Sequence, residues 1–302
     1  MSSRSVFGLD MNAWRMRVLL CEMEITADHV PVGRASGLIA GGAQRARQRF
    51  AAMAGVVFDE TAAATYDADS ADMFAPEVLE PAVELLAQLA GDGPVLELGI
   101  GTGRVALPLA QRGVEVHGID ISAPMVERLR AKPGGEAIPV TIGDMATTRT
   151  GGSYRLVYCV WNALANLVTQ DAQVDCFANV AAHLEPDGLF VVEVGYLDLR
   201  RMPAGETARA FTLTPDRLGF DTFDFANQLL ISHHYWIEGQ HLRTFQSPCR
   251  YVYPSETDLM ARLAGLAPVE RWSGWHRRSF DPDCVENVVS VWTKPAGMEM
   301  VD

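Results

Sequence analysis

The chain has 302 residues, of which 48% are hydrophobic, and it carries a formal net charge of −13. A chain of this length and hydrophobic content can bury a large core without disulfides or metals. Its Lys and Arg residues are scattered through an acidic sequence, whereas nucleic acids and anionic membranes are bound by clustered basic residues. We therefore expect no nucleic-acid partner and no membrane partner.

The five cysteines are far apart in the sequence, and none belongs to a C-x-x-C pair or to another metal-ligand spacing. Isolated thiols in odd number are typical of reduced structural cysteines rather than of a disulfide framework. No apolar run approaches the roughly 20 residues that a membrane-spanning helix needs. We expect a cytoplasmic protein that binds no metal.

Residues 1–60 contain no motif with a recognisable chemistry. A basic stretch with Arg45, Arg47 and Arg49 favours a short helix, so we interpret the segment as an N-terminal helical extension. A cap over the site, a dimerisation arm and partial disorder all stay open for it, and so does a homodimer.

Residues 61–195 alternate short apolar runs with amphipathic segments. Apolar residues at helical spacing predict a helix over Pro76–Ala90, which Gly91 ends. Strict alternation of strand and helix then predicts right-handed β-α-β units and a parallel sheet. The predicted strands are Pro94–Leu98, Val114–Ile119, Ile138–Ile142, Leu156–Val160 and Leu189–Val194, and the predicted helices between them are Thr102–Arg112, Pro124–Lys132 and Asp171–Leu184. Pro108 would remove a backbone hydrogen bond from the first of these helices, so we expect that helix to be distorted or to begin later.

Residues 196–253 break the alternation. The segments Leu229–Ile237 and His241–Phe245 are rich in β-branched and aromatic residues and flank a turn at Glu238-Gly239. This pattern is typical of an antiparallel hairpin, and we interpret the segment as an inserted substrate lid. Residues 254–302 return to the core sheet and end in a tail, with a helix at Glu256–Ala264 and strands at Val269–Trp272 and Val288–Lys294.

A glycine-rich loop, Glu97-Leu98-Gly99-Ile100-Gly101-Thr102-Gly103-Arg104, follows an apolar strand and opens a helix. Glycines at alternate positions let the backbone turn tightly and approach a ligand closely. The same context serves dinucleotide binding, but the spacing here is G-x-G-x-G and not G-x-G-x-x-G. Glu97 would repel a pyrophosphate and would suit a ligand that carries an ammonium group.

This combination resembles motif I of the class I S-adenosylmethionine-dependent methyltransferases, and the layout is similar to the actinobacterial small-molecule enzymes of natural-product pathways. Later segments extend the resemblance in chain order. Asp120 ends the second strand, Gly143-Asp144-Met145 follows the third, and Cys159-Val160-Trp161-Asn162 follows the fourth. Two further segments match the family, a Tyr66-Asp67 pair upstream and a turn of L-x-P-x-G type at Leu184–Gly188. Each match alone could be a turn glycine or a solvated carboxylate, but their order favours the family.

The resemblance implies a Rossmann-like, doubly wound α/β fold with a mostly parallel seven-stranded sheet, of which residues 61–195 form the cofactor-binding part. It implies S-adenosyl-L-methionine as cofactor and S-adenosyl-L-homocysteine as product. In this family Glu97 would meet the ammonium group, Asp120 the ribose hydroxyls and Asp144 the adenine amino group. The cofactor-binding residues that it implies are Tyr66, Glu97, Gly99, Gly101, Gly103, Arg104, Asp120, Ile121, Met125, Gly143, Asp144, Met145 and Val160.

The acceptor is less well defined by the sequence. The N/D-P-P-Y/F signature for planar amino groups is absent after strand four, and so is the Pro-Cys nucleophile of cytosine C5 enzymes. Both absences agree with the acidic charge in disfavouring nucleic acid. The aromatic content of the insertion predicts a flat aromatic or heteroaromatic small molecule, methylated by in-line displacement.

Histidine is the natural general base near neutral pH, and we interpret His233, His234 and Tyr235 as catalytic candidates. Alternate residues of a strand face opposite sides, so His233 and Tyr235 share one face while His234 and Trp236 share the other. For each histidine, a purely structural role in an aromatic lid is the alternative. The substrate-binding candidates are Trp161, Asn162, Asn166, Trp236 and Arg243.

Two other functions stay open, an NAD(P)-dependent oxidoreductase and a non-catalytic cofactor-binding scaffold. The glycine spacing, Glu97 and the lack of a Tyr-x-x-x-Lys pair disfavour the first, and the intact glycine loop disfavours the second. Within the methyltransferases, N-, O- and C-methylation are all open, and an amino-sugar N-methyltransferase is an alternative to an enzyme acting on aromatic metabolites.

Overall fold

The computed structural model describes residues 58–283 and 287–297. The predicted N-terminal extension therefore lies almost wholly outside the described residues. Within the described ranges, no helix is long and apolar enough to cross a membrane.

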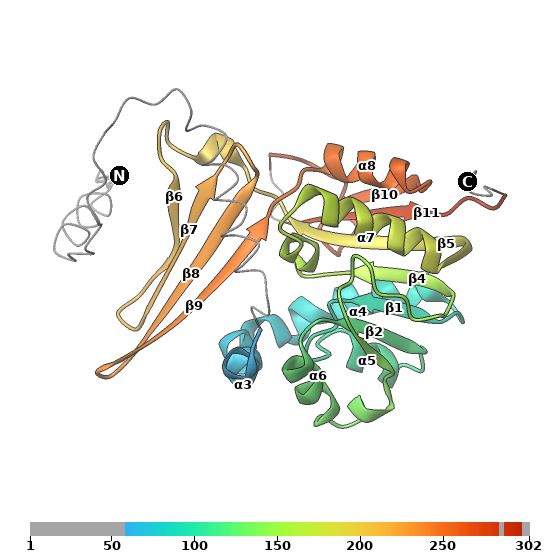
Figure 1. Ribbon diagram of the computed structural model, residues 1–302, viewed down its shortest axis with the longest axis horizontal. Helices are drawn as coiled ribbons and strands as arrows, with labels where there is room; N and C mark the ends of the chain where they lie inside the picture. The colour runs from blue at the N-terminus through green and yellow to red at the C-terminus, as the bar shows by residue number, and fades with distance from the viewer. Residues whose placement is uncertain (1–57, 284–286, 298–302) are drawn as a thin grey trace, which may run out of the picture. The chain divides into compact units, whose positions relative to one another are not determined.

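A seven-stranded sheet with the strand order β10-β11-β5-β4-β1-β2-β3 forms the core (Figure 1). Its strands are β1 Val95–Leu98, β2 Val116–Asp120, β3 Val140–Ile142, β4 Tyr154–Cys159, β5 Leu184–Gly195, β10 Ala267–Ser273 and β11 Asn287–Thr293. Strands β1 to β5 pair in parallel, and β11 lies antiparallel between β5 and β10. The predicted mostly parallel, Rossmann-like sheet is confirmed. The strand order reverses between β1 and β4, which is where open α/β sheets bind ligands.

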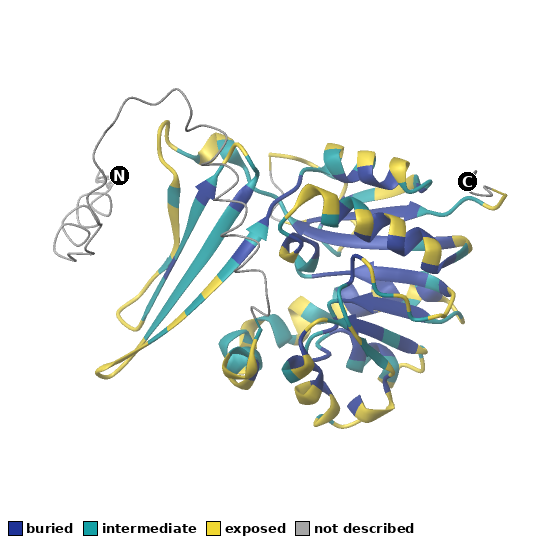
Figure 2. Cartoon of the chain, viewed as in Figure 1, coloured by how far each residue is buried: buried dark blue, intermediate teal, exposed yellow. Residues whose placement is uncertain are grey.

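Helices cover both faces of this sheet because successive strand residues point to opposite sides. Leu96 and Leu98 of β1 pack in one apolar cluster with Phe177 and Trp292, whereas Val95 packs in the other cluster. Figure 2 shows the core strands as the most buried part of the described chain. The helices are α3 Glu60–Asp69, α4 Pro76–Ala90, α5 Ala106–Gln111, α6 Ala123–Arg130, α7 Gln170–His183 and α8 Pro254–Leu263, with short 3-10 helices η1 Ala71–Phe74, η2 Gly135–Ala137, η3 Ala163–Asn166 and η4 Leu199–Arg201.

Two helix starts follow directly from the sequence. Helix α5 begins at Ala106, so Pro108 lies in its first turn, where the missing N–H has no helical partner to lose. The expectation that this helix begins later than Thr102 is confirmed. At α6 the Ser122 hydroxyl accepts a hydrogen bond from the backbone N–H of Met125 at 3.2 Å, so Ser122 is the N-cap.

A separate antiparallel sheet has the order β6-β7-β8-β9, and its strands are β6 Ala208–Leu213, β7 Arg217–Asp224, β8 Leu229–Glu238 and β9 His241–Arg250. The predicted antiparallel insertion is confirmed, and it contains two strands more than the predicted hairpin. Gly239, with φ of 65°, lies in the tight loop between β8 and β9. Strand β9 extends past Pro248, which is tolerated because β9 is an edge strand.

The base of this small sheet is fastened to the core by polar contacts. The Arg250 guanidinium is buried and donates to Gln173 of α7 at 2.5 Å and to Glu256 of α8 at 2.6 Å. A buried arginine must be hydrogen-bonded, because an unpaired charge away from water is costly. The end of β9 therefore has a fixed position relative to α7 and α8.

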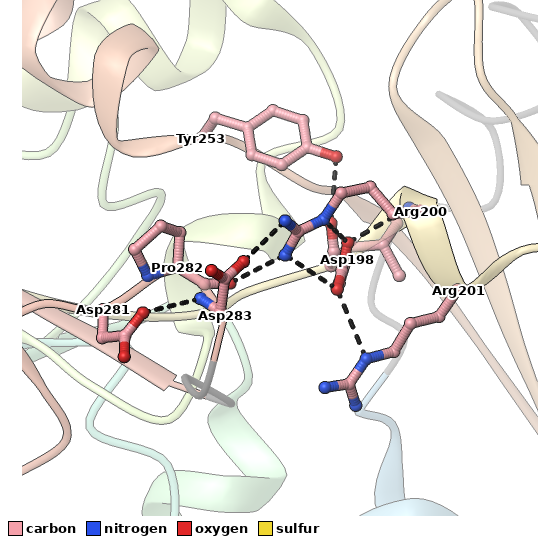
Figure 3. Close-up of polar contacts among 8 residues, drawn as sticks. Asp198, Arg200, Arg201, Tyr253, Asp281, Pro282 and Asp283 are labelled. Atoms are coloured by element: carbon pink, nitrogen blue, oxygen red, sulfur yellow. Dashed lines mark hydrogen bonds and ion pairs between the residues drawn. The ribbon is translucent and has the colours of Figure 1, made fainter.

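The connection from β5 into the small sheet is held by a second cluster (Figure 3). Arg200 donates to Asp198 at 2.7 Å and to Asp283 at 2.6 Å. The Tyr253 hydroxyl donates to the backbone carbonyl of Leu197 at 3.0 Å. These contacts are partly exposed, so each contributes little free energy of its own. Together they link the segment after β5 with the segments before α8 and β11.

Candidate functional site

A cavity of about 960 Å³ lies at the switch point between β1 and β4. One part of its wall comes from the loops that follow β1, β2, β3 and β4, and another part comes from α3 and the small sheet. All the predicted cofactor-binding residues except Gly103 line this cavity, as do all five predicted substrate-binding residues. Residues from distant parts of the sequence thus surround one space.

The glycine loop is pinned to the second strand by Asp120. One carboxylate oxygen accepts from the Gly101 backbone N–H at 2.7 Å, and the other accepts from the Ser122 N–H at 2.8 Å. Gly99 and Gly101 have φ of 70° and 54°, a region that disfavours residues with a Cβ. Each carboxylate oxygen keeps a further lone pair, so Asp120 can still accept from a ligand's hydroxyl groups.

Glu97 is a buried acid at the cavity wall. Its side chain accepts a hydrogen bond from the Tyr158 hydroxyl at 2.9 Å. Burial raises the pKa of the Glu97 carboxyl to about 8. Among the residues that the structure describes, no basic side chain forms an ion pair with it. The ionised form of this buried carboxyl is paired with no basic side chain of the described residues, so an ammonium group of a ligand would favour its ionisation.

The loop after β3 forms another part of the cavity wall. Asp144 accepts from the Ala146 backbone N–H at 2.8 Å through one oxygen, and Met145 is nearly buried beside it. Gly143 lies where a Cβ would come within 2.1 Å of the Thr148 hydroxyl. Among the described residues, the second carboxylate oxygen of Asp144 forms no ion pair with a basic side chain, so it can accept from a flat ligand with an amino group.

An aromatic and cationic group stands near the end of β4. The Arg104 guanidinium lies 4.6 Å from the centre of the Trp161 ring, and the Tyr66 ring contacts the same tryptophan edge-on at 5.8 Å. Burial raises the pKa of the Tyr66 hydroxyl. Tyr66 is positioned by α3, which is fixed because Asp67 accepts from the Thr102 hydroxyl at 2.6 Å and pairs with Lys132 at 2.5 Å.

Gly103 does not line the cavity. A Cβ at this position would come within 2.3 Å of a methyl carbon of Leu129, and its φ is 80°. The third glycine is therefore required for close packing of the loop against α6. The structure gives Gly103 a packing role, and the cofactor contact that the resemblance implies for it stays a prediction.

The small sheet contributes cross-strand rows to the wall. Arg217, Trp236 and Arg243 are directly opposite one another on β7, β8 and β9, and His234 and Phe245 form the next row. These residues line the cavity, but His233 and Tyr235 do not. The rings of His233 and Tyr235 instead stack on Phe220, at centroid distances of 4.7 and 6.0 Å.

His234 is the catalytic candidate that the structure places at the cavity. Its Nε2 lies 3.2 Å from the Ser232 hydroxyl, and its Nδ1 is buried with no hydrogen-bond partner. Its ring stacks on Trp236 at 5.6 Å. Burial and the nearby positive charge of Arg217 lower its pKa to about 4. His234 is thus neutral at physiological pH, with one nitrogen unpartnered.

Arg243 has a different position from the one expected of a free substrate-binding residue. Its two terminal nitrogens both donate to Asp69 of α3 at 2.8 Å, and its guanidinium carbon lies 3.9 Å from the Trp236 ring centre. A bidentate pair of this kind is geometrically specific. Arg243 lines the cavity while joining the small sheet to α3.

Trp161 and Asn162 adopt left-handed backbone conformations, with φ of 50° and 60°. Such conformations are strained in residues other than glycine and persist only where neighbours enforce them. The neighbour is Glu193 of β5, which is 6% exposed and accepts from the Trp161 backbone N–H at 2.7 Å. Asn162 in turn accepts from the Gly195 N–H at 3.2 Å.

Glu193, Asp69 and Arg217 were not among the predicted site residues. A signal for Glu193 existed, since a lone acid interrupts the apolar strand Leu189–Val194. No local signal marked Asp69 or Arg217, because their importance depends on partners far away in the chain.

Comparison with known proteins agrees with this geometry. A methyltransferase-domain family model matches residues 95–188. The CcbJ methyltransferase from Streptomyces caelestis is 40% identical, with a TM-score of 0.66 over 72% of this chain and 89% of that chain. The cypemycin N-terminal methyltransferase from Streptomyces sp is 29% identical over 220 residues, which cover 70% of this chain and 86% of the relative. CalS10 from Micromonospora echinaspora, an amino pentose methyltransferase in an S-adenosylmethionine-bound structure, shares the fold at 19% identity, with a TM-score of 0.56 over 88% of this chain and 99% of that chain. The chain belongs to the class I S-adenosylmethionine-dependent methyltransferases.

Proposed function

We propose that this enzyme transfers the methyl group of S-adenosylmethionine to a nitrogen atom of a small aromatic or heteroaromatic metabolite in a natural-product pathway. The observation that carries the proposal is the cavity, which runs from the glycine loop to an aromatic wall on the small sheet. Such a cavity has room for a cofactor and a flat acceptor.

The residues at the cofactor end fit this cofactor. We assign Glu97 to its ammonium group, Asp120 to its ribose hydroxyls, Asp144 to its adenine amino group and Arg104 to its carboxylate. The bound cofactor supplies a methyl group that is already activated on a sulfonium. The task of the protein is then to hold the acceptor in line, exclude water and leave the nucleophile uncharged.

The low basicity of His234 at the cavity wall favours a nitrogen nucleophile over a hydroxyl group. A base with a pKa of about 4 is poorly matched to a hydroxyl, since phenols have a pKa near 10 and alcohols a higher one. An amine attacks through its own lone pair and requires only a hydrogen-bond acceptor that orients its N–H. The unpartnered Nδ1 of His234 can provide this acceptor.

The relatives support the same choice. The cypemycin N-terminal methyltransferase, by its name, acts on an amino terminus.

The aromatic wall of Trp161, Trp236 and Phe245 favours a flat acceptor, since aromatic rings prefer stacked or edge-on contacts with one another.

The test is to incubate the full chain with S-adenosylmethionine and a panel of aromatic amines, the matching phenols and amino sugars, and to search by mass spectrometry for products that gain one CH₂ unit. We expect methylation within the aromatic amines. Methylation of phenols alone, or of amino sugars alone, would contradict the proposed acceptor. Thermal stabilisation by NADH and not by S-adenosylhomocysteine would contradict the cofactor assignment.

A further inference from the structure

The cavity wall on the small sheet contains two arginines, and they differ in how their charge is balanced. Arg243 is paired with Asp69 through two hydrogen bonds and also contacts Glu238 at 3.2 Å. Arg217 lines the same cavity, and among the described residues it has no ion pair and no side-chain hydrogen bond. Its Nε is buried without a partner. A buried donor in this state is unfavourable until a partner arrives.

Two carboxylates that feel the charge of Arg217, Asp69 and Asp216, are already engaged. Both oxygens of Asp69 accept from Arg243, and Oδ2 also accepts from the Thr65 hydroxyl at 2.8 Å. Asp216, the preceding residue, accepts from the Thr214 hydroxyl at 2.6 Å. The positive charge of Arg217 contributes to the lowered pKa of both carboxyls, but its guanidinium forms no hydrogen bond with either of them.

The contact of Arg217 with Trp236 does not replace an anion. The guanidinium carbon lies 5.5 Å from the ring centre, on a ring that Arg243 approaches more closely at 3.9 Å. A cation–π contact uses the face of the guanidinium and leaves its N–H groups free along the edge. The ring therefore positions Arg217 and does not satisfy its donors.

We propose that Arg217 binds an anionic group of the acceptor, a carboxylate or a phosphate, and so selects acceptors that carry both a nucleophilic nitrogen and a negative charge. This inference rests on the proposed function, because it assigns the acceptor to the wall formed by the small sheet. Carboxylate and phosphate oxygens both match the fork of guanidinium donors. The anion completes the hydrogen bonding of Arg217.

The register of the sheet gives this selection a geometry. Arg217 is opposite Trp236, and His234 is two residues away on the same face of β8, which is roughly 7 Å along a strand. An acceptor whose anion is held at Arg217 can extend along the Trp236 and His234 rings with its nitrogen toward the end of β4. Arg217 thereby sets the orientation of the acceptor as well as its charge.

The experiment measures binding of benzoate, phenyl phosphate and benzamide by calorimetry to the full chain saturated with S-adenosylhomocysteine. We expect benzoate or phenyl phosphate to bind at least about tenfold more tightly than benzamide, and the better of the two to identify the oxyanion. The R217M variant, which keeps an apolar stem over Trp236, loses this preference. The control variant R209M removes an exposed arginine from the neighbouring strand β6. We expect it to retain the preference for the anion.

Equal affinity for benzoate and benzamide in the unmodified protein, or an unchanged preference in R217M, overturns the proposal. The affinity for S-adenosylhomocysteine, measured for each variant, shows whether the fold and the cofactor end are intact. An anion preference without methylation of any amine refutes the proposed function and leaves the Arg217 site standing. Methylation of neutral and anionic amines at equal rates refutes the Arg217 site alone.

Discussion

The Glu193 carboxylate accepts a 2.7 Å hydrogen bond from the backbone N–H of Trp161, and this bond joins the end of β5 to a strained turn after β4. The next backbone N–H, of Asn162, donates to the carbonyl of Glu193 at 3.3 Å. One residue of β5 thus holds two consecutive residues in left-handed conformations at the cavity wall. Glu193 therefore sets the direction in which the side chains of Trp161 and Asn162 point.

Replacing Glu193 tests this relationship. The E193A variant leaves the Trp161 N–H buried without an acceptor, which costs about 1–3 kcal/mol of the free energy of unfolding and should lower kcat by releasing the turn. E193Q keeps an acceptor oxygen and should retain most of the free energy of unfolding and most of kcat. Urea unfolding and single-turnover methyl transfer measure the two effects. Equal losses in both variants would show that the charge, not the hydrogen bond, is what the turn requires.

Cofactor binding should release a proton from Glu97. Burial raises its pKa to about 8, so the carboxyl of the free protein is mostly protonated at pH 7, and a bound ammonium group favours the ionised form. We expect release of nearly one proton per S-adenosylhomocysteine at pH 7, declining toward zero above about pH 9. Calorimetry in buffers of different ionisation enthalpy measures the release.

The same raised pKa has a consequence for stability. A folded-state pKa above the unfolded value means that the native state binds the proton more tightly, so the Glu97 contribution to stability falls as pH rises from about 4.5 to about 8.

E97Q cannot ionise, so it serves as the control in which proton release on cofactor binding disappears. It should also weaken cofactor binding by about tenfold to a hundredfold, as expected for loss of a charged hydrogen bond. Proton release that persists in E97Q would assign the proton to another group.

The two adjacent histidines of β8 provide a matched pair. His234 lines the cavity and His233 does not, so H234A should reduce kcat by about 10- to 100-fold, as expected for loss of a hydrogen bond that orients the nucleophile. H233A should leave kcat nearly unchanged, since His233 bonds to the Thr222 hydroxyl at 3.0 Å on the opposite face. Steady-state kinetics with the acceptor identified by mass spectrometry measures both. A larger effect of H233A would reverse the assignment of the two faces.

Two glycines with similar φ values allow the cost of overpacking to be measured apart from the cost of backbone strain. Gly103 and Gly113 have φ of 80° and 85°, but a Cβ would meet Leu129 at 2.3 Å in the first and nothing within 4 Å in the second. G113A should cost about 1–2 kcal/mol for the left-handed conformation. G103A adds an overpacking cost of about 1–3 kcal/mol. Urea unfolding compares them, and equal losses would mean that the loop can move away from α6.

Local pattern was sufficient for most of the core. The apolar runs and the alternation of strand with helix predicted β1 to β5, because each strand of a parallel sheet is buried on both faces and is continuous in sequence. Strands β6 and β7 were missed because residues such as Arg217, Asp221 and Asp224 hide any alternation. Helix α3 was missed because its apolar periodicity is weak, and it is held instead by Asp67 contacts with Thr102 and Lys132.

The sequence by itself determined that Glu97, Asp120 and Asp144 meet at one edge of the sheet, since each lies at or just after the end of a strand and parallel strands bring their carboxyl ends to one edge. The tertiary structure alone decided which residues of the small sheet line the cavity. The pairing of Arg243 with Asp69 joins residues 174 positions apart, and the register of β8 decides that His234 and not His233 faces the cavity. Contacts across such distances depend on how whole elements pack, and no local pattern of residues encodes them.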